Sequence, residues 1–354
     1  MNEISLKVDV DTYRGTLLGV PRLTSLFERL GVRATFLFTL GPDHTGRALR
    51  RIFRRGFIGK MRRASVIQHY GIKTLLYGTL IPGPHIARHC AGTMKDVARR
   101  GFEVGVHAYD HAKWQNHVRS ANLQWTRREL RLARDQFLEV FGAYPQVHGA
   151  AGWQLNRFVP RLEGDFGFRF ASDVRGKCPF IPVTADGRVA GIPQLPTTLP
   201  TLDELIGRPD LGGIHPADYL LGLTAASPEK PHVFTLRAEI EGGAYLEAFE
   251  RLLRGWQAEG RLLGTLSDYY ETLDSSSLPH YQIVPGAALG RSGLMAWQAP
   301  AEFSPQAAAA RAERHAAMIA EMARLHTLHD PFSMFFDPPD DPVADAEKAH
   351  RQKH

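Results

Sequence analysis

The sequence predicts an α/β fold in which parallel strands form an open sheet or a closed barrel. Strand-like segments alternate with helix-like segments from residue 4 to about residue 273, a pattern typical of parallel sheets. The 354 residues are enough to bury a large core in one domain or in two. Polar side chains follow several predicted strands, and in parallel folds the reactive groups gather at the carboxyl ends of the strands.

The first half of the chain opens with a β-α-β unit. Apolar and polar residues alternate along its first segment, as in a strand with one buried face. Pro82 and Pro84 interrupt the chain before the next regular segment. Strands are expected at 4–10, 32–38, 102–107 and from 145, and helices at 18–30, up to 100 and at 124–140.

The second half continues this alternation until about residue 275, where the pattern changes. Strands are expected at 168–172 and 232–236, and helices at 245–259 and 266–273. Ser304 and Pro305 are typical of a helix start, and the end of the chain is rich in proline and aspartate. We predict a main domain over 1–275 with an insertion at 44–83, an extension over 276–300, and a helical appendage with a flexible tail over 301–354.

Cysteine content and hydropathy exclude several classes of protein. Cys90 and Cys178 are the only cysteines, so neither a disulfide framework nor a zinc site made of thiolates is expected. Residues 1–7 lack the basic and apolar regions of a secretory signal. No apolar run approaches the length that crosses a bilayer. We therefore expect the protein to act on the cytoplasmic side.

The positive charge of the chain is concentrated in one segment. The net charge is +6, and no acidic residue occurs between Asp43 and Asp96. Basic and apolar residues share this segment, which favours an interface with anionic lipid over a merely solvated helix face. Nucleic-acid binding is less favoured, because no recognition motif accompanies the basic residues. The expected membrane-binding residues are Arg50, Arg51, Phe53, Arg54, Arg55, Phe57, Lys60, Arg62 and Arg63.

Asp9 and Asp11 lie at the end of the first predicted strand. Residues two apart on a strand face the same way, so the two carboxylates point together. Like charges on one face repel unless a cation lies beside them or one of them carries a proton. A solvated strand end is the alternative. The apolar character of this strand favours a metal or an acid–base role.

His107 and His111 follow the third predicted strand, four residues apart. On a helical turn their rings would share one face and could bind one metal ion. Chance pairs also arise among 16 histidines, and His85 with His89 is such a pair. One carboxylate with two imidazoles leaves open positions for water and substrate, and a second carboxylate can serve as base. Zinc, manganese, cobalt and nickel all suit these ligands.

These two motifs resemble those of the polysaccharide deacetylase family, the metal-dependent carbohydrate deacetylases that share the chitooligosaccharide deacetylase homology domain. In that family the earlier aspartate is the base and the later one a metal ligand, which implies these roles for Asp9 and Asp11. The family's paired histidines correspond to His107 and His111, with Ala108 where serine or threonine is usual. The resemblance implies a distorted (β/α) barrel with seven units and a divalent metal cofactor.

A closer resemblance is to the branch that acts on lipid-linked aminoarabinose, the undecaprenyl-phosphate 4-deoxy-4-formamido-L-arabinose deformylases. It extends from about residue 4 to residue 298. It implies hydrolysis of a formamido sugar on a polyprenyl phosphate carrier, for lipid A modification and resistance to cationic antimicrobial peptides. The motifs that carry it are Asp9–Thr16, His107–His111, Ala150–Trp153, Ser172–Gly176, Pro196–Thr201 and Ala238–Gly242.

The same resemblance implies the partners and the substrate site. The substrate would be bound through Trp153, Asp173, Arg175 and Glu239. The partner would be the cytoplasmic face of the bacterial inner membrane, which the protein would contact peripherally. The basic segment would then hold the enzyme on the bilayer and receive the phosphate of the substrate.

Arg237 departs from the family pattern. A histidine at this position is the general acid of the family, whereas a guanidinium, with a pKa above about 12, is a poor proton donor near neutrality. Arg237 could instead stabilise an oxyanion or bind phosphate, and Glu239 or Asp173 could supply the proton. Two alternatives to the deformylase therefore stay open: a deacetylase of another N-acylated glycan, and a weakly active or inactive metal-binding relative.

Overall fold

The computed structural model describes residues 2–47, 74, 76–206, 208–288, 291 and 293–300. The expected membrane-binding residues, Arg50 to Arg63, lie outside the described residues. The predicted appendage and tail over 301–354 lie outside them as well. These two expectations therefore stay predictions.

Seven parallel strands form the main sheet, in the order β5-β4-β3-β2-β1-β7 with β8 also paired to β1. Each predicted strand is present, and only the ends differ by a few residues. The strands are β1 (Glu3–Val10), β2 (Thr35–Thr39), β3 (Glu103–Ala108), β4 (Val147–His148), β5 (Phe170–Ala171), β7 (His232–Arg237) and β8 (Leu262–Gly264).

The central strand is β1, and all eight of its residues are buried. β2 pairs with its carboxyl-terminal half, and β7 pairs along most of its length, from Ile4 to Asp9. Asp9 is the register partner of Arg237 on β7. The carboxyl ends of β1, β3 and β7 therefore bring the predicted site residues to one end of the sheet.

An irregular segment, residues 194–198, lies between β5 and β7. Gln194 forms a parallel bridge with Ala171, and the N–H of Leu195 donates to the carbonyl of Ala171 at 2.7 Å. At its other end the N–H of Thr198 donates to the carbonyl of Val233 at 3.0 Å. Six strands and this irregular segment thus form the ring, with β8 beside β1 off its path, and the predicted distorted seven-unit barrel is confirmed.

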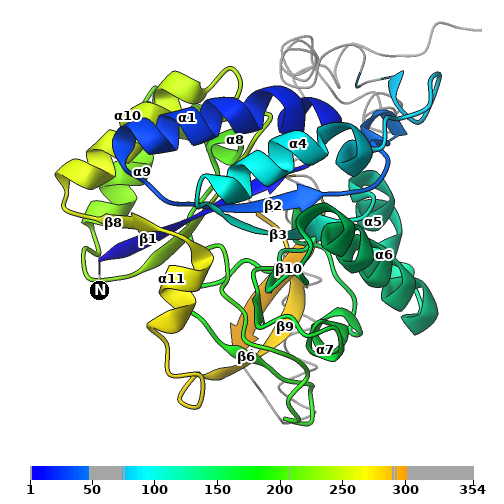
Figure 1. Cartoon of the computed structure of the whole chain (residues 1–354). Coiled ribbons are helices and arrows are strands. Elements are labelled where there is room, and N and C mark those ends of the chain that lie inside the picture. The colour runs from blue at the N-terminus through cyan, green and yellow to red at the C-terminus, as the bar shows by residue number, and fades with distance from the viewer. Residues whose placement is uncertain are drawn as a thin grey trace, which may run out of the picture. The chain divides into compact units, whose positions relative to one another are not determined.

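Helices cover the outer face of the sheet, in the spatial order α10, α1, α4 and α6 (Figure 1). Phe27 of α1 packs edge-on against Phe36 of β2 and Phe249 of α10, so the largest core lies between helices and strands. A π-helix, η1 (Gly15–Gly19), follows β1 after residues 11–14. The longer helices are α1 (Val20–Leu30), α4 (Ile86–Arg99), α6 (Leu123–Phe141), α9 (Pro216–Ala225) and α10 (Leu246–Ala258), and the shorter ones are α5 (His111–His117), α7 (Val159–Asp165), α8 (Leu202–Leu205) and α11 (Leu266–Glu271).

A second, three-stranded sheet is formed partly by the predicted extension. β9 (His280–Gly286) pairs with β10 (Met295–Pro300) in antiparallel fashion and with β6 (Ile181–Pro182) in parallel. The N–H of Arg175 donates to the carbonyl of Ala296 at 2.9 Å. The end of the described chain is thereby tied to the loop that follows β5.

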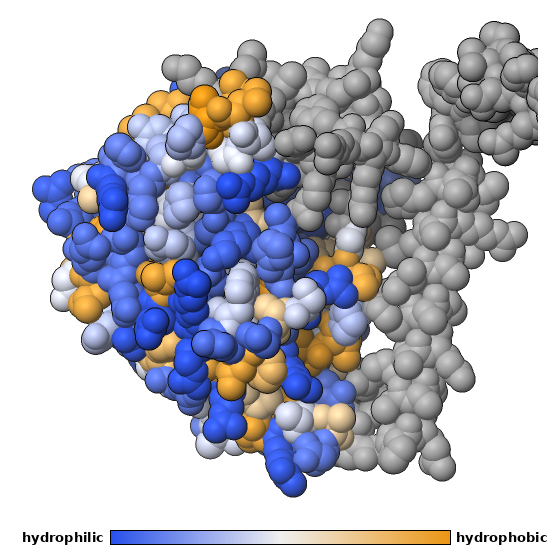
Figure 2. Space-filling view, turned by 90° about the vertical axis from the view of Figure 1, so that its right-hand side faces the viewer, coloured by the Kyte–Doolittle hydropathy of each residue, from blue (hydrophilic) through white to orange (hydrophobic). Residues whose placement is uncertain are grey.

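Figure 2 shows one face, on which hydrophilic residues surround small apolar patches. Among the described residues, no helix is both long enough and apolar enough to span a bilayer.

Candidate metal and catalytic site

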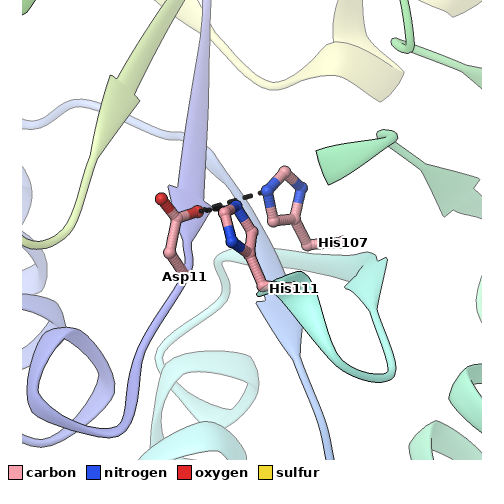
Figure 3. Close-up of side chains that lie close together, drawn as sticks. All are labelled: Asp11, His107 and His111. Atoms are coloured by element: carbon pink, nitrogen blue, oxygen red, sulfur yellow. Dashed lines mark ion pairs between the residues drawn. The ribbon is translucent and has the colours of Figure 1, made fainter. Parts of the chain in front are cut away.

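Asp11, His107 and His111 form a cluster of three potential metal ligands, here called the ligand cluster. Asp11 Oδ1 lies 3.2 Å from His107 Nε2 and 3.4 Å from His111 Nε2. The carboxylate follows β1, His107 belongs to β3, and His111 begins α5, so three elements converge on one point (Figure 3). The geometry brings together the three residues that the sequence predicted as ligands.

The protonation of His107 suits metal binding. Its Nδ1 lies 2.6 Å from the carbonyl oxygen of Gly149, and because a carbonyl only accepts, Nδ1 must carry the proton. Nε2 therefore directs a lone pair at Asp11, an arrangement typical of metal-binding histidines. Within the described chain, His107 Nε2 and Asp11 Oδ1 are buried atoms without a hydrogen-bond partner. A cation between them would satisfy both, so these residues fit a divalent metal.

His111 reaches the cluster without the helical turn that the spacing suggested. β3 ends at Ala108 and α5 starts at His111, yet the two imidazole rings stack with their centroids 5.4 Å apart. Asp110 caps α5 by accepting the N–H of Lys113 at 2.9 Å. Burial opposes the charge on Asp11, but His111 and His107 in their protonated forms outweigh it and lower the pKa of this carboxyl. Asp11 is therefore an anion, as a ligand must be.

Asp9 lies beside the cluster and faces a buried lysine. Its Oδ1 is 3.8 Å from His107 Nδ1 and 3.6 Å from Lys7 Nζ. Lys7 is fully buried, donates to the carbonyl of Ser172 at 2.7 Å, and lies over the ring of Trp153. A buried ammonium requires such partners. The sequence analysis missed Lys7, although its position two residues before Asp9 on the same strand face is a usable signal.

Arg237 reaches the ligand cluster from β7. Its Nε lies 3.7 Å from Asp11 Oδ2, and its Nη1 donates to Asp203 Oδ2 at 2.7 Å. Asp203 also pairs with Arg291 at 3.2 Å. Arg237 is thus held at the edge of the cluster by a carboxylate that the sequence analysis did not select.

Trp153 and Arg175, expected to bind substrate, take part in a buried network beside Lys7. Arg175 forms a bidentate pair with Glu204, with N···O distances of 3.0 and 3.2 Å. The guanidiniums of Arg175 and Arg291 lie 5.1 and 4.5 Å from the centre of the Trp153 ring. Trp153 is itself 1% exposed. Both residues support the site from within the fold, and a direct contact with substrate stays a prediction for them.

Asp173, the third expected substrate ligand, is buried with His148 and Glu163. His148 Nδ1 lies 2.6 Å from Glu163 Oε1 and 3.1 Å from Asp173 Oδ1. Asp173 also accepts the N–H of Ala150 at 2.6 Å and an amide hydrogen of Gln194 at 3.1 Å. This second group of possible ligands is saturated by protein donors, which favours a structural role over a metal site.

The three members of this buried triad shift each other's pKa values. Burial by itself would lower the pKa of His148, but Asp173 and Glu163 raise it to about 10. Burial and the charge of Asp173 raise the pKa of Glu163, whereas His148 outweighs burial at Asp173 and lowers its pKa to about 2. The triad therefore contains an imidazolium and an ionised Asp173 at neutral pH.

Glu239, the fourth expected substrate ligand, contacts the backbone of the ligand cluster. Its Oε1 accepts the N–H of Asp11 at 3.1 Å, the N–H of Thr12 at 2.9 Å and the hydroxyl of Thr12 at 2.7 Å. Burial and the nearby charge of Asp11 raise the pKa of Glu239 to about 8. Its Oε2 is buried and has no hydrogen-bond partner in the described chain.

Two curated relatives match most of this chain. A protein from Shewanella sediminis (strain HAW-EB3) is 36% identical over 253 residues, which cover 72% of this chain and 81% of the relative. A protein from Wigglesworthia glossinidia brevipalpis is 31% identical over 285 residues, which cover 80% of this chain and 98% of the relative. Both are named "Probable 4-deoxy-4-formamido-L-arabinose-phosphoundecaprenol deformylase ArnD". No family model matches the sequence.

Solved structures support the fold. A Mycobacterium smegmatis protein, provisionally named a polysaccharide deacetylase, superposes with a TM-score of 0.55 at 18% identity, over 81% of this chain and 94% of its own. A probable polysaccharide deacetylase from Pseudomonas aeruginosa PAO1 gives a TM-score of 0.51 at 14% identity, over 76% of this chain and 89% of its own. At these identities the likeness establishes the barrel architecture alone.

Asp11→Asn and His107→Gln are expected to weaken divalent metal binding by at least tenfold to a hundredfold, roughly what even outer partners of a metal contribute. Metal content after dialysis and calorimetric titration with Zn²⁺ or Co²⁺ would measure this. His85→Gln is the matched control, because His85 and His89 share the four-residue spacing but belong to no ligand group in the described chain. Equal metal retention by Asp11→Asn and His85→Gln would contradict the assignment.

Folding stability is expected to decrease as pH rises from about 7 to about 10. The pKa of His148 is raised to about 10 in the folded protein, so its stabilising contribution is complete below the unfolded value of about 6.5 and is lost as pH rises through about 10. Glu163, whose pKa is also raised, acts in the same direction. Urea unfolding across this range would show a shallower decrease for His148→Gln than for the exposed control His280→Gln. If unfolding free energy fell equally with pH in the two variants, His148 would not be the cause of the decrease.

Proposed function

This chain belongs to the 4-deoxy-4-formamido-L-arabinose-phosphoundecaprenol deformylases, and we propose that it hydrolyses the formamide of undecaprenyl-phosphate 4-deoxy-4-formamido-L-arabinose to the free amine and formate. The observation that carries this proposal is Asp9 beside the ligand cluster, at the carboxyl ends of β1 and β3. The free amine serves lipid A modification and resistance to cationic antimicrobial peptides such as polymyxin.

Asp11, His107 and His111 would hold the metal. When bound there, a divalent ion supplies a Lewis acid and a water of lowered pKa. The support is the pair of buried, unpartnered atoms, Asp11 Oδ1 and His107 Nε2. The hydrogen bond from His107 to Gly149 fixes the ring in the orientation that binding requires.

Asp9 is the base in this proposal. Its carboxylate takes a proton from the attacking water as the oxygen–carbon bond to the formamide forms. Lys7, whose Nζ lies 3.6 Å from Asp9 Oδ1, holds the carboxylate in place. As the carbon–nitrogen bond breaks, the proton passes from Asp9 to the leaving nitrogen, which completes the amine and formate.

Arg237 contributes charge in place of an acid. Its guanidinium, held by Asp203 at 2.7 Å, is a fixed positive charge next to the oxygen that becomes negative in the transition state. Asp173 does not replace the missing acid, since its pKa of about 2 leaves it without a proton. Glu239, with a pKa of about 8, is the second candidate for donating a proton to the amine.

The substrate named for the relatives is attached to a polyprenol phosphate, so the enzyme would act at a membrane. The basic apolar segment from Arg50 to Arg63 supplies the charges and apolar side chains for peripheral binding to an anionic leaflet. The cytoplasmic face of the bacterial inner membrane is the proposed location.

Asp9→Asn is expected to reduce formate release by roughly 10²- to 10⁴-fold, the contribution of one acid–base group. The amide keeps the shape of the side chain but accepts no proton from water. The assay is formate release from the lipid-linked formamido sugar by the metal-loaded protein. Asp135→Asn, at an exposed position of α6, is the control. A metal-loaded wild-type protein that releases no formate would refute the deformylase proposal.

Arg237→His is expected to raise kcat and to add a decline in rate above about pH 6.5, because imidazole donates a proton only while charged. Arg237→Ala is expected to lower kcat, since it removes the fixed charge. The pH profile of kcat for both variants would separate the two effects. No gain with histidine would show that a missing acid does not limit turnover, and wild-type kcat in Arg237→Ala would remove Arg237 from the mechanism.

A further inference from the structure

A cavity of about 170 Å³ lies between η1, the start of α1 and the loop that joins β7 to α10. Its volume suits a group of many atoms rather than a single bound water, which occupies roughly 10–15 Å³. Its walls include Arg14, Gly15, Leu18, Arg22, Glu239 and Gly243. None of the activities described so far uses its two arginines.

Arg14 and Arg22 give the cavity its positive charge. Both side chains are exposed, and neither has a carboxylate within ion-pair distance among residues that the structure describes. Two unpaired guanidiniums on one cavity are a suitable receptor for a phosphate, whose oxygens accept their paired N–H groups.

Glu239 provides an independent sign of a ligand on the opposite wall. The residue is 4% exposed, and its Oε2 is a buried polar atom without a hydrogen-bond partner among the described residues. Buried polar atoms are normally hydrogen-bonded. A sugar hydroxyl in the cavity, which can both donate and accept, would provide the missing partner.

Two glycines allow the walls to approach each other. A Cβ at Gly15 would lie 1.9 Å from Glu239 Oε1, and one at Gly19 would lie 2.0 Å from the carbonyl oxygen of Ala238. A larger residue at position 15 would push Glu239 from its contact with Asp11. The cavity is thus built against the ligand cluster, with Glu239 as the shared wall.

An exposed leucine lies in the wall of the cavity beside the arginines. Leu18 of η1 is 42% exposed and lines the cavity, and its sequence neighbour Leu17 is 43% exposed. An apolar side chain next to the two arginines suits an anion attached to a hydrocarbon better than a free ion.

We propose that this cavity binds the phosphodiester of the lipid-linked substrate, with Arg14 and Arg22 on its oxygens, Glu239 hydrogen-bonded to the sugar, and Leu18 against the first carbons of the lipid. The inference rests on the proposed function. It assigns the phosphate to η1 and α1, whereas the sequence analysis assigned it to the basic segment that ends at Arg63. Glu239 places the sugar between this cavity and the ligand cluster.

Calorimetric titration of the full-length protein with geranyl phosphate tests the site directly. Arg14→Gln and Arg22→Gln are each expected to weaken this binding roughly tenfold, since each removes a charge-assisted hydrogen bond. Arg161→Gln, at an exposed arginine of α7, is the matched control and should bind as wild type. Inorganic phosphate should bind more weakly than geranyl phosphate but show the same dependence on the two arginines.

Steady-state kinetics and vesicle binding separate a specific phosphate site from general binding to a lipid surface. They also separate failure of this inference from failure of the proposed function. Arg14→Gln and Arg22→Gln should raise KM for the lipid-linked substrate while kcat changes little, and should bind phosphatidylglycerol vesicles like wild type. Unchanged geranyl phosphate binding in both variants, or a loss confined to vesicles, would overturn the inference. Because the titration needs no turnover, arginine-dependent binding without formate release would refute the deformylase and support the phosphate site.

Discussion

The burial of Lys7, Asp9 and Asp11 is the constraint around which this end of the molecule is built. Lys7 and Asp9 share one face of β1, a strand whose eight residues are all buried, and Asp11 directly follows that strand. Charges in such a place are stable only with partners, because removal from water is costly. The carbonyl of Ser172, the two histidines and Arg237 supply those partners from neighbouring strands and loops.

The ion pairs that balance these buried charges extend beyond the residues in direct contact with Asp9 and Asp11. Arg237 is paired with Asp203, Asp203 with Arg291, and Arg291 with Glu204. Arg291 comes from the segment between β9 and β10, so the extension of the chain contributes to the same network as the barrel. Trp153 contributes the aromatic face on which Arg291 and Arg175 lie. The position of Arg237 is therefore fixed by contacts from three distant parts of the sequence.

The sequence was informative where local periodicity decides the structure. The alternation in β1 was sufficient to place Asp9 and Asp11 on one face, and the alternation of strands and helices was sufficient for a parallel sheet, whereas the closed barrel was implied only by the family resemblance. The segment 194–198 has no such periodicity, and it completes the ring through hydrogen bonds with residues distant in sequence. Asp203 could not be predicted either, because its role depends on a partner 34 residues away. Lys7 followed the same alternation as the aspartates, and a rule that expects hydrophobic residues in the core passes over a buried lysine.

The pairing of Arg237 and Arg291 with one carboxylate has a consequence for how this protein can evolve. Asp203 accepts from Arg237 through Oδ2 and lies 3.2 Å from Arg291 at the same oxygen. A histidine at position 237 would inherit an aspartate already shared with another cation. Arginine or histidine at this position is thus one state of a three-residue unit, and a lineage that exchanges one for the other also changes how the charge of Asp203 is divided between position 237 and Arg291.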